Sequence, residues 1–335
     1  MPQGVEFDIP FPPALNPNLE RARPGHMAWL REQGLIRTTH EAELYLFMQI
    51  SEATAYTYNR ADPDELRLAL DMVGWTALFN DQFDGPTGKQ PERTRAVCQE
   101  LVQLTRRPPG AGEPKTAATR AWVDVWRRSC HRMSEAWRER AAANWREYIA
   151  SHTDETDNRT TSSRPSAEEY PRLRRATVGM GPYLDLTERV YHAELPAQLD
   201  QHPALNRMRT LATDVVWLID DVHSVEREQA RGDVHNFVLL LERDRSRPEA
   251  IGSIQARVAQ ATAEFRQLET RSKALPDELG LTGSQAQALT CYLASMRDFM
   301  SGTYQWLRTS PRFRPAGVIP PERPGHIADI LADFP

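Results

Sequence analysis

Three oxygen-bearing side chains recur at a four-residue spacing in the second half of the chain. Asp220, Ser224 and Glu228 stand at positions i, i+4 and i+8. On an α-helix this spacing places them on one face, with a drift of about 40° per step. Carboxylate and hydroxyl oxygens suit a hard divalent cation, and Arg227 beside them could hold an anion bridged to the same metal. Because the largely apolar segment 211–219 precedes this row, we expect the row to begin where a buried helix reaches a cavity.

A second acidic group lies upstream, where Asn80 is followed by Asp81 and Asp84. The two aspartates are i, i+3 neighbours and share a helix face. Two oxygen-rich rows, each at the end of an apolar run, predict a metal cluster held between two helices. A cluster of Mg²⁺ ions with so few protein ligands needs a second anion, and diphosphate is the obvious one.

Both rows resemble the metal motifs of the bacterial class I terpene synthases. The second row reads Asp220-Asp221-x-x-Ser224-x-x-Arg227-Glu228, which matches the family motif N/D-D-x-x-S/T-x-x-K/R-E at every position. The first row matches D-D-x-x-D except that an asparagine replaces the leading aspartate. The segment 231–238 that follows the second motif is also similar to the family.

The end of the chain carries a third similarity. Gly302-x-x-x-Trp306, followed by Arg312 and Phe313, resembles the closing family pattern G-x-x-x-W-x-x-x-x-x-R-Y, with phenylalanine in place of tyrosine. Arg312 could still bind diphosphate, whereas Phe313 cannot make the hydrogen bond of a phenol. Arg174 best matches the arginine with which the family senses diphosphate, and Arg175 is the alternative; Thr177 and Val178 occupy the positions of a small residue and a free carbonyl.

The resemblance implies a single-domain, all-α helical bundle around a central apolar cavity. It implies a lyase that ionises an isoprenyl diphosphate substrate with the help of Mg²⁺, three ions in number, with Mn²⁺ as a substitute. The implied metal ligands are Asn80, Asp81, Asp84, Asp220, Ser224 and Glu228. The implied diphosphate-binding residues are Arg174, Arg227 and Arg312. The catalytic candidates are Arg174, Phe79 and Trp306.

Aromatic side chains are candidates for stabilising a carbocation by their ring faces. Phe79 and Trp306 are preferred because each adjoins a motif, and Trp75, Trp217 and Tyr304 are further candidates. Each of these side chains, taken singly, is more often a core aromatic.

Composition bounds the class of protein. The 335 residues include 40% hydrophobic and 26% charged residues, typical of a globular protein, and the net charge of −5 gives no basic footprint for nucleic acid. Three dispersed cysteines form neither a metal site nor an even disulfide framework, which predicts a cytoplasmic protein. The first residues do not form a signal peptide, and no apolar run approaches the ~20 residues of a membrane span.

The order of elements follows from apolar periodicity and breakers. We expect ten to twelve helices in one domain, residues 1–335, with a proline-rich N-terminal arm at 1–17 and a C-terminal tail at 314–335. A breaker-rich loop is expected at 107–114, a polar loop at 152–165 and a helix break at 177–182. The expected helices span 18–35, 40–58, 63–84, 89–105, 117–151, 184–195, 203–243, 248–274 and 284–308, and a further helix runs from about residue 169 to the break.

Several alternatives stay open. Farnesyl diphosphate is the favoured substrate, with geranylgeranyl diphosphate, and hence a diterpene synthase, as the alternative. A chain-elongating prenyl diphosphate synthase would need an aspartate where Ser224 stands. A non-catalytic helical protein of terpene synthase type, its first motif degenerate at Asn80, is the alternative of another class. A homodimer is the assembly considered, although the sequence fixes neither the oligomeric state nor the identity of the product.

Overall fold

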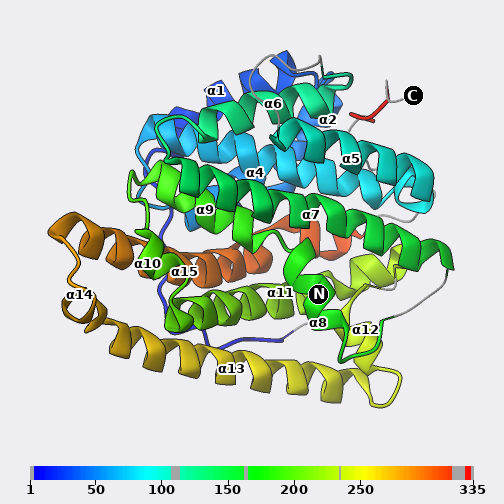
Figure 1. The fold of residues 1–335 in the computed structure, drawn as a ribbon. Coiled ribbons are helices and arrows are strands. Elements are labelled where there is room, and N and C mark those ends of the chain that lie inside the picture. The colour runs from blue at the N-terminus through cyan, green and yellow to red at the C-terminus, as the bar shows by residue number, and fades with distance from the viewer. Residues whose placement is uncertain (1–3, 107–113, 162–164, 234, 319–328, 333–335) are drawn as a thin grey trace.

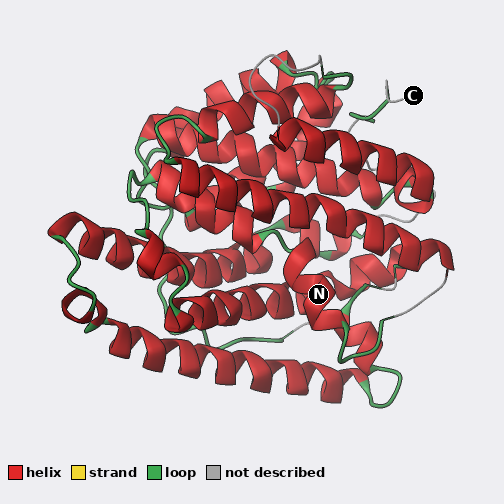
Figure 2. Ribbon diagram, viewed as in Figure 1, coloured by secondary structure: helices red, strands yellow, loops and turns green. Residues whose placement is uncertain are grey.

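The computed structural model describes residues 4–106, 114–161, 165–233, 235–318 and 329–332. Helices make up the regular structure of these residues, and no strand occurs among them (Figure 2), which confirms the all-α prediction. The helices are α1 (Leu19–Glu32), α2 (Thr39–Met48), α3 (Ile50–Thr57), α4 (Pro63–Phe83), η1 (Pro86–Lys89), α5 (Pro91–Arg106), α6 (Ala117–Ser129), α7 (Glu135–Thr161), α8 (Tyr170–Thr177), α9 (Met180–Val190), α10 (Ala197–Asp200), α11 (Pro203–Arg231), α12 (Phe237–Leu241), α13 (Arg247–Ser272), α14 (Leu275–Glu278), α15 (Gly283–Thr309), η2 (Pro311–Phe313) and η3 (Pro315–Gly317).

The long helices run roughly side by side in layers (Figure 1). In the view of Figure 1, α1 and α6 lie at the top, α4 and α7 below them, and α11 and α15 lower still, with α13 along the bottom edge. Helix α11 packs against both α13 and α15, and α3 packs against α4 and α15. Helices α4, α7, α11 and α15 therefore stand around the centre of the molecule.

Local signals in the sequence set the ends of the helices that matter for the site. The Asp62 carboxylate caps α4 by accepting the backbone N–H groups of Asp64 and Glu65, both at 3.0 Å. The expected break after α8 is confirmed, because Gly179 adopts a φ of +74° and separates α8 from α9. Gly232, with φ +71°, ends α11 in the same left-handed conformation.

Two helix predictions are wrong in the first half of the chain. The stretch 117–151 is not one helix, because α6 ends at Ser129 and the Ser134 hydroxyl caps a new helix by accepting the N–H of Trp137 at 3.1 Å. Residues 152–161 of the predicted loop are helical, because α7 continues to Thr161. Its polar residues are helical since several of them, such as His152 and Glu155, are buried and have packing partners.

Two further differences concern helix ends and helix number. The predicted helix 203–243 ends at Arg231, where a glycine reverses the chain, and the short α12 follows. The structure also breaks 40–58 at Gln49, which takes a left-handed φ of +54° between α2 and α3. The described residues thus contain fifteen α-helices, three of them of four or five residues, against the expected ten to twelve.

The N-terminal arm is extended, as its prolines predict, and it is anchored from residue 4 onward. The backbone N–H of Phe7 donates to the Tyr304 hydroxyl at 2.9 Å, and Gln255 of α13 donates to the carbonyl of Glu6 at 2.7 Å. Asn16 donates to two carbonyls at the end of α3 and beyond. The described residues of this arm are therefore held against α3, α13 and α15.

One apolar core cluster includes residues from Phe7 to Leu331, and the single domain stays a prediction. In the described part of the tail, the Ala118 N–H donates to the Ile330 carbonyl at 3.2 Å. The predicted loop at 107–114 falls almost wholly outside the described residues, as do 319–328 and 333–335 of the tail. Within the described ranges, none of the helices combines the length and the apolar character needed to cross a membrane.

Helices α3 and α15 approach closely at Gly302. A Cβ atom there would lie 2.9 Å from the backbone carbon of Tyr56, inside the normal contact distance. We expect Gly302→Ala to force the two helices apart, to cost about 1–3 kcal/mol of stability and to lower the melting temperature. Thermal unfolding followed by circular dichroism measures the effect. Gly252→Ala on α13 is the control, because nothing lies within 4 Å of its Cβ position, and equal behaviour of both variants would contradict the argument.

Candidate active site

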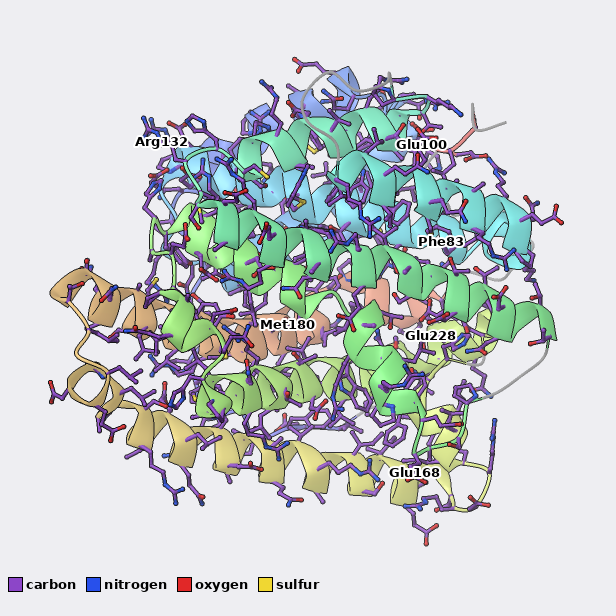
Figure 3. All side chains as sticks on the ribbon, in the orientation of Figure 1. Phe83, Glu100, Arg132, Glu168, Met180 and Glu228 are labelled. Carbon is purple, nitrogen blue, oxygen red and sulfur yellow. The ribbon has the colours of Figure 1, made fainter. Side chains whose placement is uncertain are left out.

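A cavity of about 250 Å³ lies between α3, α4, α7, α8, α9, α11 and α15. Apolar and hydroxyl side chains form much of its wall: Ile50, Ala53, Thr54, Thr57, Val73, Thr76, Ala77, Thr177, Val178, Met180, Val216 and Thr303. Aromatic, acidic, amide, arginine and histidine side chains form the rest. Glu228 and Met180, which both line it, are labelled in Figure 3.

The second motif row reaches this cavity as its spacing predicts. Asp220, Ser224 and Glu228 of α11 all line the cavity. Burial raises the pKa of the Glu228 carboxyl to about 8, and the neighbouring carboxylates of Asp221, Asp233 and Asp220 act in the same direction. This end of the cavity therefore concentrates negative charge in a buried place, where a cation would stabilise the ionised carboxylates.

Arg174 faces this row from α8. Its Nη2 donates to Asp220 Oδ2 at 2.5 Å and its Nε donates to Asp221 Oδ1 at 2.8 Å. Arg174 lines the cavity, whereas Arg175 forms an outward pair with Asp214 at 2.7 and 2.8 Å and is absent from the cavity wall. The structure thus favours Arg174 over Arg175 as the arginine that could meet an anion in the cavity.

The two adjacent aspartates of the second motif have different surroundings. The Asp220 side chain is 24% exposed and lines the cavity, while the Asp221 side chain is fully buried. Asp221 accepts hydrogen bonds from the Tyr170 hydroxyl at 2.9 Å and from the Phe237 N–H at 2.8 Å, besides the bond from Arg174. Asp221 therefore joins α8, α11 and α12.

The residues of the first motif have different surroundings. Asn80 and Asp84 line the cavity, and Asp81 does not. Asp81 forms a double hydrogen bond with Arg312 at 2.7 and 3.2 Å. Burial favours a raised pKa for Asp81, but the charge and hydrogen bonds of Arg312, together with the charges of Arg227 and Arg231, hold the pKa below its usual range. The prediction that Asp81 faces the cavity as a metal ligand is therefore not supported by its position.

Asp84 is held from the opposite wall. Arg227 Nη2 donates to Asp84 Oδ2 at 2.6 Å, and Arg231 Nη1 donates to the same oxygen. Arg227 and Arg312 both line the cavity, as predicted for diphosphate-binding residues. These ion pairs link the end of α4 to the end of α11 and to the segment after α15.

Most of the aromatic side chains that the sequence suggested for the cavity do not line it. Phe79 is fully buried and stacks on Trp75, with ring centroids 5.0 Å apart, and neither lines the cavity. Trp217 and Tyr304 are likewise absent from the cavity wall, whereas Trp306 is part of it. The aromatic side chains that line the cavity are Tyr148, Tyr183, Phe299, Trp306 and Phe313.

The reason for the error at Phe79 is helical phase. Asn80 faces the cavity, and the preceding residue is turned about 100° around the helix. Phe79 therefore points into the core, where it contacts Phe83 and His152. Phe313, by contrast, lines the cavity and packs edge to face on Trp306 at 4.9 Å.

Sequence reasoning missed a polar cluster at the cavity. Glu155, Arg159, Asp233 and His235 all line it. Arg159 donates to Asp233 at 2.9 and 3.2 Å, and His235 Nδ1 lies 2.9 Å from the other Asp233 oxygen. The i, i+4 pair of Glu155 and Arg159 was the available signal, in a stretch assigned to a loop. Arg231, which binds Asp84, was missed because the second motif ends before it.

The donor set suits a hard divalent cation. Two carboxylates, a hydroxyl and an amide oxygen line the cavity at Asp220, Glu228, Ser224 and Asn80. Among the described residues, no three His, Cys, Asp or Glu side chains form a group that could hold a metal ion unaided. The residues present thus fit a cation that completes its coordination with other oxygens, such as those of a bound anion.

Comparisons with known proteins agree with this site. Residues 71–264 match the model of the terpene synthase family 2, C-terminal metal binding. The chain is 38% identical over 334 residues to the (−)-β-caryophyllene synthase ((2E,6E)-farnesyl diphosphate cyclizing) of Saccharothrix espanaensis, covering 98% of this chain and 94% of that protein. It is 34% identical over 334 residues to the pentalenene synthase of Streptomyces avermitilis, covering 98% and 99%.

Solved structures give the same result. The crystal structure of an α-eudesmol synthase superposes with a TM-score of 0.84 at 32% identity, covering 91% of this chain and 99% of that one. Germacradien-4-ol synthase from Streptomyces citricolor superposes with a TM-score of 0.81 at 29% identity, covering 92% and 99%.

Proposed function

This chain belongs to the bacterial class I terpene synthases, which are lyases, and from that premise we propose that it ionises and cyclises farnesyl diphosphate with release of diphosphate. The product is a terpene hydrocarbon or alcohol. The observation that carries the proposal is the cavity itself, whose wall combines carboxylate, hydroxyl and amide oxygens with arginines beside apolar side chains. The relatives named above, one of which cyclises farnesyl diphosphate by its name, support it.

The arginines of the cavity are suited to bind the leaving group. Arg174, Arg227 and Arg312 line it and would donate charge-assisted hydrogen bonds to the oxygens of a diphosphate. Each now donates to a carboxylate of a metal motif. A bound diphosphate would share or take over these donors, so its negative charge would be stabilised as it separates from the carbon chain.

Asp220, Ser224, Glu228 and Asn80 are the residues that would hold Mg²⁺. When bound, the metal supplies Lewis-acid neutralisation of the diphosphate charge. The proposal includes three Mg²⁺ ions, with Mn²⁺ as a substitute. It also keeps Asp81 and Asp84 as metal ligands. For Asp84 to bind a cation, its pairs with Arg227 and Arg231 would have to loosen.

The walls beyond the polar end would control the carbocation. Tyr148, Tyr183, Phe299 and Trp306 present aromatic groups to the cavity, and ring faces attract cations. Aliphatic neighbours keep the space dry, which a cation so reactive toward water requires. This assignment replaces the predicted catalytic role of Phe79 and keeps that of Trp306.

Cavity size gives no reason to prefer the longer geranylgeranyl diphosphate. The volume of about 250 Å³ lies below the ~300–1,000 Å³ that is usual for ligand pockets. A chain with one more isoprene unit would need the walls to move further. A geranylgeranyl substrate is the second candidate, and a homodimer and a cytoplasmic location remain predictions.

The deciding experiment incubates the purified protein with geranyl, farnesyl and geranylgeranyl diphosphate, each with Mg²⁺ or with a chelator. Gas chromatography–mass spectrometry identifies the products. A cyclic C15 product that the chelator abolishes is the expected result. No product from any substrate, with diphosphate still bound in the presence of Mg²⁺, would overturn the proposal in favour of the non-catalytic alternative.

Asn80 provides a test of the first motif. Its amide oxygen can ligate Mg²⁺ but brings no negative charge, so Asn80→Asp should lower the half-saturating Mg²⁺ concentration by roughly 10-fold. Initial rates measured against Mg²⁺ concentration report this value. Asn206→Asp, which adds the same charge at the N-terminal end of α11, is the control and should leave it unchanged. An unchanged or higher Mg²⁺ requirement in the Asn80 variant would contradict the expectation.

A further inference from the structure

Asn236 is fully buried at the start of α12 and is not part of the cavity wall. Its side-chain oxygen accepts the backbone N–H groups of Val238 at 2.9 Å and Leu239 at 3.4 Å, and so caps α12. A cap needs an acceptor alone. Capping therefore does not account for the amide nitrogen of the Asn236 side chain.

The amide nitrogen of Asn236 is bonded entirely to α11. It donates to Glu228 Oε2 at 2.6 Å and to the backbone carbonyl of Asp221 at 2.7 Å, and it lies 3.5 Å from the Ser224 hydroxyl. A primary amide has two N–H donors, and both have short partners here. With its oxygen held by α12 and its nitrogen by α11, the side chain has one orientation that satisfies all four bonds.

Two described residues that precede Asn236, Gly232 and Asp233, are anchored to neighbouring helices. Gly232 turns the chain back, and the N–H of Asp233 donates to the carbonyl of Glu228 at 3.0 Å. The Asp233 side chain is held by Arg159 of α7 at 2.9 Å. The position of Asn236 relative to Glu228 is thus set by three helices, α7, α11 and α12.

Glu228 needs such a support. Its carboxylate lies in a buried place near three other carboxylates, which repel it. A hydrogen bond to one oxygen fixes the rotation of the carboxylate without neutralising its charge. Groups that orient a metal ligand in this way commonly change metal affinity or activity by about 10- to 100-fold when they are removed.

We propose that Asn236 is a positioning residue that holds the Glu228 carboxylate for a divalent cation and couples the end of α11 to α12. This inference rests on the proposed role of Glu228 as a metal ligand. Asn236 is assigned no contact with substrate. The sequence showed only that segment 231–238 is similar to the family. The proposal gives one of its residues, Asn236, a role at the metal site.

The test uses Asn236→Ser in the full-length protein. Serine keeps a good helix cap, but its shorter side chain cannot reach Glu228. Binding of Mn²⁺ in the presence of inorganic diphosphate, followed by electron paramagnetic resonance, gives a readout that needs no turnover. We expect the Mn²⁺ affinity to fall roughly 10- to 100-fold, and the half-saturating Mg²⁺ concentration for turnover to rise in parallel.

Two further variants make the result specific. Glu228→Gln removes the ligand charge, and its combination with Asn236→Ser should be no worse than Glu228→Gln alone, because the two residues act as a unit. Thr282→Ala removes the cap of α15 and should lower the melting temperature without changing Mn²⁺ affinity. Circular dichroism shows that each variant is folded.

The outcomes distinguish a failure of the positioning role of Asn236 from a failure of the metal-ligand role of Glu228. If the wild type binds Mn²⁺ and Glu228→Gln weakens it, but Asn236→Ser binds like the wild type, the positioning role is overturned and the metal site stands. Additive losses in the double variant would also overturn it. If Glu228→Gln binds Mn²⁺ like the wild type, the assignment of Glu228 as a ligand fails, and the role of Asn236 fails with it.

Discussion

Replacing Arg174 by glutamine should lower kcat by roughly 10²- to 10³-fold, the usual loss when one preorganised donor to a developing anion is removed. Arg174 is the arginine that contacts both aspartates of the second motif while lining the cavity. The variant loses the donor to the leaving diphosphate and the cation that balances Asp220 and Asp221. Product formation from farnesyl diphosphate at saturating Mg²⁺ measures the loss.

The adjacent arginine is a matched control. Arg175→Gln removes the same charge one residue away, where the side chain pairs with Asp214 outside the cavity wall. We expect its turnover to equal that of the wild type. Arg174→Lys should recover little, because an ammonium group cannot reproduce the two-pronged contact. Equal losses in the two glutamine variants would mean that position 174 has no special relation to the leaving group.

Asp220 and Asp221 should respond in opposite ways to the same substitution. Asp220→Asn removes a charge from the cavity, where a carboxylate about 4 Å from a cation contributes about 4 kcal/mol per unit charge at a dielectric of about 20. We therefore expect the half-saturating Mg²⁺ concentration to rise roughly 10²- to 10³-fold. The unfolding free energy should change little, since the side chain is partly exposed.

Asp221→Asn should mainly destabilise the fold. The buried carboxylate accepts bonds from Arg174, Tyr170 and Phe237, and an amide has one oxygen with which to replace two. Breaking a buried charge pair typically costs about 3–5 kcal/mol. Urea unfolding measures this loss. If the Asp220 variant were the less stable one, the assignment of one aspartate to the cavity and the other to the core would be reversed.

The sequence predicted the helices and the second metal row because both follow from periodicity. On a helix, oxygen-bearing residues spaced four apart lie on one face. Asp220, Ser224 and Glu228 do line the cavity together. The cap at Asp62 and the break at Gly179 have equally local causes. These features need no knowledge of the rest of the chain.

Features that depend on partners far along the chain could not be predicted in this way. The pairing of Asp81 with Arg312 joins residues 231 positions apart, and periodicity does not show it. Spacing also fixes which residues share a face but not which face meets the cavity. Phe79 adjoins Asn80 yet points into the core for this reason.

Helices rich in polar residues are a second feature that apolar periodicity does not predict. The end of α7 carries buried polar side chains such as His152 and Thr156, so an apolar stripe was absent where a helix exists. Its contribution to the cavity, through Glu155 and Arg159, was lost with it. Buried polar groups that satisfy one another are recognisable once the structure places them together.

The arginine–carboxylate pairs around the cavity have a consequence for the order in which ligands arrive. Asp81, Asp84, Asp220 and Asp221 already engage Arg312, Arg227, Arg231 and Arg174, so the charges within this group balance before any ligand enters. Free diphosphate would then meet little unbalanced positive charge, and a lone cation would face competition from guanidinium groups. Cations and diphosphate together keep the sum of charges close to zero. The arrangement thus favours their uptake as one neutralised assembly, with each component strengthening the binding of the other.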